Sequence, residues 1–243
     1  MQNDGSDRPQ GRLFFSIIIP AHNEAGYIGD TLAHIAALDY PRESFETIVV
    51  ENGSTDDTYR IAERYADKNI TLFRSDQGTS KAKNAGAEAA RADADWIIFL
   101  DADTLLEKEF LAELCRYLSL SQRHPAIGTV TVRPNPETFS ARLWFALYDF
   151  GHWCSHTSAS IQIAKRNLFP TVRFDEALIT SEDGDLIAQA MRYGTFFIMR
   201  TRLVSTSTRR FEKLGWWRTL FNWVSVGILP KRLRRKFTYE VVR

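Results

Sequence analysis

One stretch constrains this chain more than any other: residues 96–100 are all apolar and run directly into two aspartates. Aromatic and β-branched residues without polar alternation are typical of a strand buried on both faces of a sheet. Asp101 and Asp103 therefore come at the carboxyl end of that strand, where open α/β sheets bind ligands. Carboxylates in such a place need a cation, and Mg²⁺ or Mn²⁺ takes oxygen ligands from protein and phosphate. The alternative is a solvated turn in which Asp103 caps a helix starting at Thr104.

Strand-like and helix-like segments alternate along the first hundred residues. Strands are predicted at 14–19, 45–50, 70–73 and 96–100, and helices at 25–38, after the 51–57 turn and at 81–90. Pro20 is expected to stop the first strand. Later strands are predicted at 127–132, 160–164, 195–199 and 203–205, and later helices through 110–118 and at 186–193. This order predicts an α/β fold, with a mostly parallel sheet covered by helices on both faces.

An aromatic-rich segment at 139–153 has helical spacing. Two interpretations stay open for it: a helix packed into the core, or the lining of a site for an apolar acceptor. The two cysteines, Cys115 and Cys154, are too few for a disulfide framework, so a reducing, cytoplasmic setting is expected. The first twelve residues are polar and show no signal peptide, and no apolar run is long enough to span a bilayer.

Charge is distributed unevenly along a chain whose net charge is only +1. From Arg200 onward there are twelve Lys or Arg and two Asp or Glu, so the rest of the chain is acidic. Residues 215–229 show apolar helical spacing, Pro230 ends that pattern, and residues 231–236 hold five basic side chains. Aromatic residues beside a basic cluster favour an anionic membrane surface as a partner. The alternative is that the same apolar face packs on the rest of the protein.

The predicted parallel strands bring several polar segments together. Because the carboxyl ends of parallel strands meet at one edge, residues 20–24, 51–56, 78–84 and 101–103 should share a rim. Glu51 could accept from the imide N–H of a base, Lys81 and Lys83 could meet phosphates, and Asp101 with Asp103 could hold a metal that bridges a diphosphate. Each also has a plainer interpretation, as a turn and cap or as a solvated helix face.

The motifs on this rim resemble those of the family 2 glycosyltransferases, which have the GT-A fold. The resemblance rests on Ile18-Ile19-Pro20-Ala21-His22-Asn23-Glu24, Val49-Val50-Glu51-Asn52-Gly53-Ser54-Thr55-Asp56, Lys83-Asn84-Ala85-Gly86 and Leu100-Asp101-Ala102-Asp103. Phe174-Asp175-Glu176 and Ser181-Glu182-Asp183-Gly184-Asp185-Leu186 are similar to the family's acceptor-side segment. Together these segments extend over roughly residues 15–203.

The resemblance implies an inverting, metal-dependent transfer of sugar from a nucleotide-diphospho-sugar to an acceptor hydroxyl. It implies Mn²⁺ or Mg²⁺ on Asp101 and Asp103, and Asp183 as general base beside Glu182. The implied donor-binding residues are Pro20, Ala21, His22, Asn23, Glu24, Glu51, Gly78, Lys81, Lys83, Asp101, Ala102, Arg209 and Arg210. The acceptor is expected to be a sugar, a lipid-linked molecule or a cell-envelope glycan precursor, used in the cytoplasm or on the inner face of the membrane.

The expected organisation is a disordered lead-in at 1–12, a Rossmann-like GT-A catalytic domain at 13–208 and a basic aromatic tail at 209–243. Residues 13–104 form the nucleotide-sugar-binding half and 105–208 the acceptor half. The sequence departs from the family pattern with Glu51 in place of an Asp, Thr79 in place of a Lys, and 205–210 in place of a metal-binding His.

Other functions are weighed against this one. Glu182 and Asp183 could be only a charge pair favoured by a helix N-terminus. A sugar-phosphate nucleotidylyltransferase would need a Gly-rich, Arg-containing loop where residues 21–24 stand, which argues against that activity. A non-catalytic module that binds nucleotide-sugars, or a membrane or nucleic acid through the tail, is the third hypothesis, although no nucleic-acid partner is expected.

Overall fold

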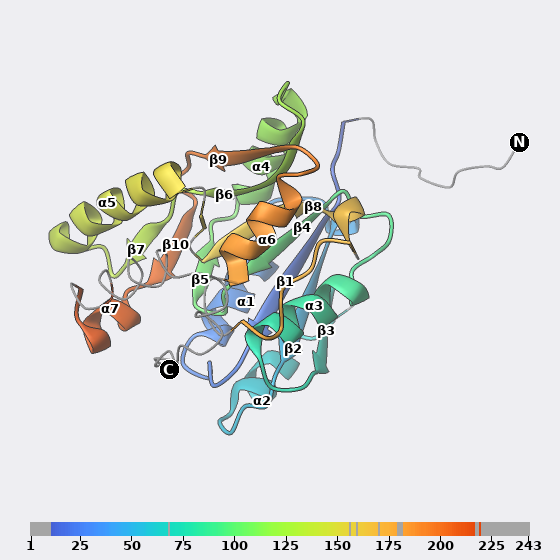
Figure 1. The fold of residues 1–243 in the computed structure, drawn as a ribbon. Coiled ribbons are helices and arrows are strands. Elements are labelled where there is room, and N and C mark those ends of the chain that lie inside the picture. The colour runs from blue at the N-terminus through green and yellow to red at the C-terminus, as the bar shows by residue number, and fades with distance from the viewer. Residues whose placement is uncertain are drawn as a thin grey trace, which may run out of the picture.

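The computed structural model describes residues 11–67, 69–155, 157–158, 160–169, 171–178, 182–216 and 219. Its centre is a seven-stranded sheet in the order β3-β2-β1-β4-β8-β6-β9 (Figure 1). The strands are β1 Phe15–Ala21, β2 Phe45–Glu51, β3 Ile70–Arg74, β4 Trp96–Leu100, β6 Pro125–Val130, β8 Ile161–Lys165 and β9 Thr195–Met199. Strands β1 to β4 run parallel, β8 is antiparallel to β4 and β6, and β9 is parallel to β6. The predicted α/β fold with a mostly parallel sheet is confirmed.

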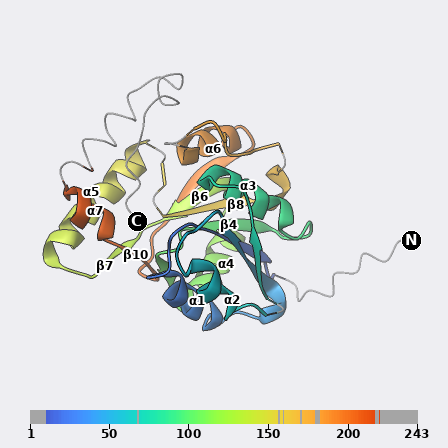
Figure 2. The same ribbon diagram turned by 90° about the horizontal axis from the view of Figure 1, so that it is seen from below.

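Helices cover both faces of this sheet (Figure 2). They are α1 Ile28–Ala36, α2 Thr58–Glu63, α3 Thr79–Ala89, α4 Phe110–Leu120, α5 Phe139–Ser155, α6 Glu182–Ala190 and α7 Arg209–Leu214, with 3-10 turns at Arg42–Ser44 and Arg166–Leu168. In β1, Ile17 and Ile19 join the core cluster of α1 and α4, whereas Ile18 joins the cluster of α3 and α6. Side chains alternate across a strand, so β1 is buried on both faces, as its unbroken apolar pattern predicts.

A second sheet of three strands, in the order β5-β10-β7, corrects one expectation. Its strands are β5 Thr104–Leu106, β7 Arg133–Asn135 and β10 Val204–Ser207. Residue 104 therefore begins a strand, and the helix after the two aspartates starts only at Phe110. The reason is long-range pairing: Thr104 lies opposite Thr206, and their side-chain oxygens are 2.9 Å apart. This sheet places α5, which contacts β7, at one side of the molecule (Figure 1).

Element ends differ from the predicted ones where tertiary context decides. Strand β1 continues through Pro20 to Ala21, because it pairs with β4 only as far as Ile18 and beyond that point has β2 alone as partner. A missing N–H is tolerated at such an edge. Helix α6 begins at Glu182, four residues before the predicted start. Most of the apolar pattern at 215–229, and the basic cluster at 231–236, lie outside the described residues.

The aromatic segment 139–153 does form a helix, but only one face of that helix is buried. Ala141 and Phe145 of α5 are buried, but Phe139, Leu143 and Leu147 are exposed. Core packing therefore accounts for one face of this helix and not for the other. Among the described residues, no helix has both the length and the apolar character that crossing a bilayer requires.

Candidate functional site

The carboxyl ends of β1, β2, β3 and β4 meet at one edge of the sheet, as predicted. The register places Ala21 beside Glu51 and Glu51 beside Arg74. The loops beyond these strands are tied together by hydrogen bonds across about thirty residues of sequence. These bonds run from Asn23 N to Ser54 Oγ (3.0 Å), Thr55 N to Asn23 Oδ1 (2.8 Å), Glu24 N to Thr58 Oγ1 (2.7 Å) and Ala25 N to Asp56 Oδ2 (3.1 Å). The segment that follows Pro20 is thus held rigidly against the segment that follows Val50.

Glu51, the residue expected to accept from a base, is buried at this edge and already has protein partners. Its carboxylate accepts a hydrogen bond from the backbone N–H of Ser54 and lies 3.4 Å from Nε of Arg74. The guanidinium of Arg74 in turn lies over the ring of Tyr59, 4.0 Å from its centroid. A base would share these contacts, so its recognition by Glu51 stays a prediction. The adjacent Asn52 is also buried, and its Oδ1 has no hydrogen-bond partner. Sequence reasoning did not single out this acceptor.

Asp103 is clamped by an arginine from the far end of the chain. Nε of Arg209 lies 3.1 Å from Oδ2 of Asp103, and its Nη2 lies 2.6 Å from Oε1 of Glu24. The same guanidinium lies 4.4 Å from the ring centroid of Tyr27. Three of the predicted donor-binding or metal residues, Glu24, Asp103 and Arg209, are therefore in contact. Arg209 is thus the counter-ion of both Glu24 and Asp103, a pairing that was not predicted.

The electrostatics of the two aspartates fit a bound divalent cation. Burial raises the pKa of Asp101 to about 7, and the negative charges of Asp103 and Asp183 act in the same direction against Lys83 and Arg210. Burial also raises the pKa of Asp103 in spite of Arg209 and Arg210. Burial is the largest cause of both shifts, and it disfavours the charged carboxylates unless a cation neutralises them. Oxygen donors in this state suit Mg²⁺ or Mn²⁺.

The protein supplies few ligands to such a metal. Across the described part of the chain, no three His, Cys, Asp or Glu side chains cluster closely enough to hold an ion. Two aspartates with the remaining positions filled by water and phosphate oxygens is nevertheless the usual arrangement for Mg²⁺. Residues 205–210, where the family pattern has a metal-binding histidine, hold none, and Arg209 of this segment lies against Asp103.

Lys83 and Asp183 form a buried ion pair that joins α3 to α6. Only 2% of the Lys83 side chain is exposed, and its Nζ lies 2.8 Å from Oδ1 of Asp183 and 3.2 Å from Oε1 of Gln162. The ammonium also lies 4.9 Å from the ring centroid of Phe174. Burial alone would lower the pKa of Lys83, but the charges of Asp183, Glu182 and Asp101 outweigh burial and raise it. Lys83 is therefore a fixed cation beneath the rim.

The structure separates the two lysines that the sequence grouped as phosphate contacts. Lys81 has 44% of its side chain exposed and lies 3.9 Å from Asp76, so it can reach a ligand in solvent. Lys83 points the other way and is occupied by Asp183 and Gln162. A direct contact of Lys83 with phosphate stays a prediction that this burial does not favour. Lys83 lies three and four residues before Gly86 and Ala87, so all three are on the same buried face of α3. This spacing, which is visible in the sequence, indicates that Lys83 is buried.

Asn84, which follows Lys83 on α3, holds the segment of Phe174 and Glu176 in place. Its Nδ2 donates to the backbone oxygen of Phe174 and to Oε1 of Glu176, both at 3.0 Å, and its Oδ1 accepts from Phe174 N at 3.0 Å. Gly86 lets α3 approach β1 this closely, because a β-carbon there would collide with Ile18. Two adjacent side chains on one helix thus position both motifs that resemble the acceptor side.

Glu182 and Asp183 occupy the first turn of α6, as the plainer interpretation of a helix N-terminus requires. The contact of Asp183 with Lys83 goes beyond that interpretation. Burial raises the pKa of Glu182 to about 7, and the adjacent charge of Asp183 adds to the shift. Asp183 keeps 26% of its side chain exposed, so a carboxylate held by a buried lysine still faces solvent at the rim.

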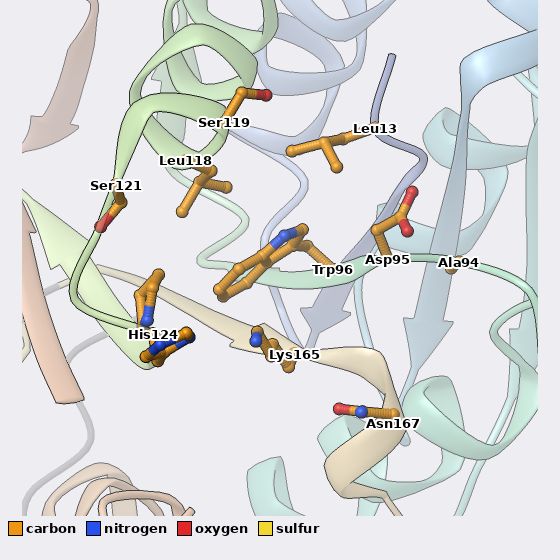
Figure 3. Close-up of a pocket in the computed structure, with 11 residues that line it drawn as sticks. Leu13, Ala94, Asp95, Trp96, Leu118, Ser119, Ser121, His124, Lys165 and Asn167 are labelled. Atoms are coloured by element: carbon orange, nitrogen blue, oxygen red, sulfur yellow. The ribbon is translucent and has the colours of Figure 1, made fainter. Parts of the chain in front are cut away.

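A separate cavity of about 420 Å³ lies at the opposite end of the central strands (Figure 3). Trp96 at the start of β4 and Lys165 at the end of antiparallel β8 line it, together with His124 and Asn167. Because Asp101 follows the other end of β4, this cavity is not part of the predicted site.

Curated proteins with related sequences include glycosyltransferases. The chain is 32% identical over 108 residues to poly(ribitol-phosphate) β-N-acetylglucosaminyltransferase TarS of Staphylococcus aureus, covering 43% of this chain and 18% of TarS. It is 35% identical over 102 residues to the glycosyltransferase AglE of Haloferax volcanii, covering 40% of this chain and 33% of AglE. The matched part is thus a third or less of each of these relatives.

Solved structures share the fold. S. aureus TarS in complex with UDP-GlcNAc superposes with a TM-score of 0.66 at 21% identity, over 81% of this chain and 59% of that one. Mannosyltransferase PcManGT from Pyrobaculum calidifontis, in complex with GDP-Man and Mn²⁺, gives a TM-score of 0.63 at 20% identity, over 92% of this chain and 67% of that one. The model of glycosyl transferase family 2 matches residues 16–177, well over half of the chain. The chain therefore belongs to the family 2 glycosyltransferases.

Proposed function

We propose that this glycosyltransferase moves a sugar from a nucleoside-diphosphate sugar to an acceptor hydroxyl with inversion, and that Asp183 is the general base. The observation that supports this most is the ion pair of Lys83 and Asp183, which fixes a carboxylate on the same rim as Asp101 and Asp103. Structural relatives bound to UDP-GlcNAc and to GDP-Man with Mn²⁺ support the donor class and the metal.

Charge neutralisation of the leaving diphosphate is the first requirement of this reaction. Asp101 and Asp103 would hold Mg²⁺ or Mn²⁺, and a metal bound there supplies Lewis-acid stabilisation of the diphosphate. Arg209 and Lys81 add positive charge from the protein. Arg209 is held in place by Glu24 and Tyr27, so it needs little reorganisation to act.

Proton removal from the acceptor is the second requirement. The ion pair uses Oδ1 of Asp183, which leaves Oδ2 to accept the proton of the attacking hydroxyl. Lys83 fixes the rotamer of Asp183 through this contact, so the free oxygen is held in a defined position, as a general base requires. Attack from the side opposite the diphosphate inverts the anomeric carbon.

The acceptor is proposed to be a sugar, lipid-linked or part of a cell-envelope glycan precursor. The proposed place of action is the cytoplasm or the inner face of the membrane. The basic cluster at 231–236 supports a negatively charged surface as partner.

The test compares Asp183→Asn with Asp185→Asn. Both residues are carboxylates in the first turn of α6, but Asp185 bonds to Gln189 of its own helix, with Nε2 3.0 Å from Oδ2. A thermal-shift panel of nucleotide-sugars with and without Mn²⁺ first identifies the donor. Asp183→Asn should then bind that donor normally and lose transfer by about a hundredfold or more. Near-normal turnover of Asp183→Asn, or an equal loss in Asp185→Asn, would refute the role of Asp183.

A further inference from the structure

Helix α5 has two apolar faces, and the described residues pack against only one of them. Ala141 and Phe145 face inward, with the Phe145 ring 5.5 Å from that of Phe211 on α7. Phe139, Leu143 and Leu147 are 84%, 59% and 60% exposed. Their spacing of four residues places them along one line of the helix, opposite the buried pair.

Such a stripe differs from ordinary surface exposure. Single exposed apolar side chains are normal, but contiguous patches of a few hundred square ångströms mark interaction sites. Six large hydrophobic side chains are exposed among the described residues, and α5 contributes three of them in one row. The others, Leu120, Met191 and Tyr193, lie on or next to other helices.

We propose that this row of Phe139, Leu143 and Leu147, the α5 stripe, inserts into the headgroup region of an anionic lipid leaflet. Helix α5 lies at the outer edge of the molecule in both views (Figures 1 and 2). Helix α5 and its neighbour α7 together hold four Arg or Lys and two Asp or Glu, so the net charge of this helix pair complements anionic lipid. A helix lying in the membrane plane buries such an apolar face while nearby Lys and Arg meet lipid phosphates.

The position of the stripe connects the leaflet to the site. Helix α7 contacts α5 through Phe211 and contacts Asp103 through Arg209, which lies 3.1 Å from that carboxylate. A leaflet against α5 would therefore lie one short helix away from the proposed metal site. An acceptor anchored in the membrane could then reach the rim. The proposal goes beyond the proposed catalysis and does not depend on it.

Vesicle flotation of the full chain tests the stripe directly. Vesicles of equal parts phosphatidylcholine and phosphatidylglycerol should bind the protein, and phosphatidylcholine alone should bind it weakly. The double variant Leu143→Glu/Leu147→Glu should bind anionic vesicles at least tenfold less. Leu120→Glu, at the 75% exposed leucine that ends α4, is the control and should bind normally. Leu143→Phe/Leu147→Phe keeps an apolar stripe and should also bind normally.

Four outcomes would overturn the proposal. They are absence of flotation for the unmodified chain, unchanged flotation of the glutamate double variant, an equal loss in Leu120→Glu, and loss of flotation in the phenylalanine variant. Melting temperature and oligomeric state are measured on every variant. If the glutamate variant instead melts at lower temperature with unchanged flotation, the chain's own C-terminal segment covers the stripe. If it converts a dimer to a monomer with unchanged flotation, the occupant is a second copy.

Discussion

Replacing Lys83 by methionine removes the cation beneath Asp183 and keeps most of the apolar volume of the side chain. Removing one partner of a fully buried ion pair costs about 3 to 5 kcal/mol. Asp183 is 26% exposed, so its carboxylate regains some hydration, and we expect a loss of about 2 to 3 kcal/mol in the free energy of unfolding. The hydrogen bond of 3.2 Å from Nζ to the side-chain oxygen of Gln162 would also be lost.

The control is Lys81→Met on the same helix. Lys81 is 44% exposed and 3.9 Å from Asp76, so its replacement should change stability by less than about 0.5 kcal/mol. Urea unfolding followed by circular dichroism should show a midpoint lower by about 1 M for Lys83→Met and an unchanged midpoint for Lys81→Met. Equal midpoints for the two variants would refute the reasoning about the buried pair.

Activity assays on the same variants separate two roles of Lys83. If Lys83 acts through Asp183, Lys83→Met should bind the donor normally and lose turnover, and Lys83→Arg should recover part of it. If Lys83 contacts the donor phosphates, as the sequence first suggested, donor affinity should fall instead. Calorimetric titration of the donor, compared with turnover at saturating donor, decides between these roles.

Three further results are expected. Asp103→Asn should abolish the Mn²⁺ dependence of donor binding in calorimetry, and unchanged metal-dependent affinity would contradict the assignment. Gly86→Ala should lower stability by about 1 to 3 kcal/mol in thermal unfolding because its methyl group collides with Ile18; full stability would mean that α3 can shift. Burial raises the pKa of Asp149 from the ordinary 3.8 to about 6 against a hydrogen bond from Val132, so its ionised form opposes folding increasingly from about pH 4 and fully above pH 6. After allowance for solvent screening, Asp149→Asn should therefore raise the free energy of unfolding by about 1 to 2 kcal/mol at pH 8 and by almost nothing at pH 4. A gain in stability that does not depend on pH would refute this cause.

The sequence predicted the sheet edge and most of its loops because apolar runs fix strands and parallel strands fix where their ends meet. It did not predict that residue 104 begins a strand, since that depends on pairing with Thr206 a hundred residues later. Lys83 was recognisable as a site residue, but its ion pair with Asp183 was not. The spacing of residues along a helix indicates which side chains are buried, but it does not indicate which residues they contact. The clamp of Arg209 on Asp103 and Glu24 left no local signal at all.

The contact between Arg209 and Glu24 joins residues 185 positions apart, and that between Lys83 and Asp183 joins residues 100 apart. A chain that leaves the ribosome from its N-terminus can therefore form the loops of β1 and β2 early, but it cannot close these contacts until Asp183 and Arg209 have emerged. Contacts of such sequence separation slow folding, since loop closure costs entropy before the contact forms. The enzyme would thus complete its site only after Arg209 has been synthesised, and a nascent chain interrupted before Asp183 would have the nucleotide-side loops without the proposed base or the arginine.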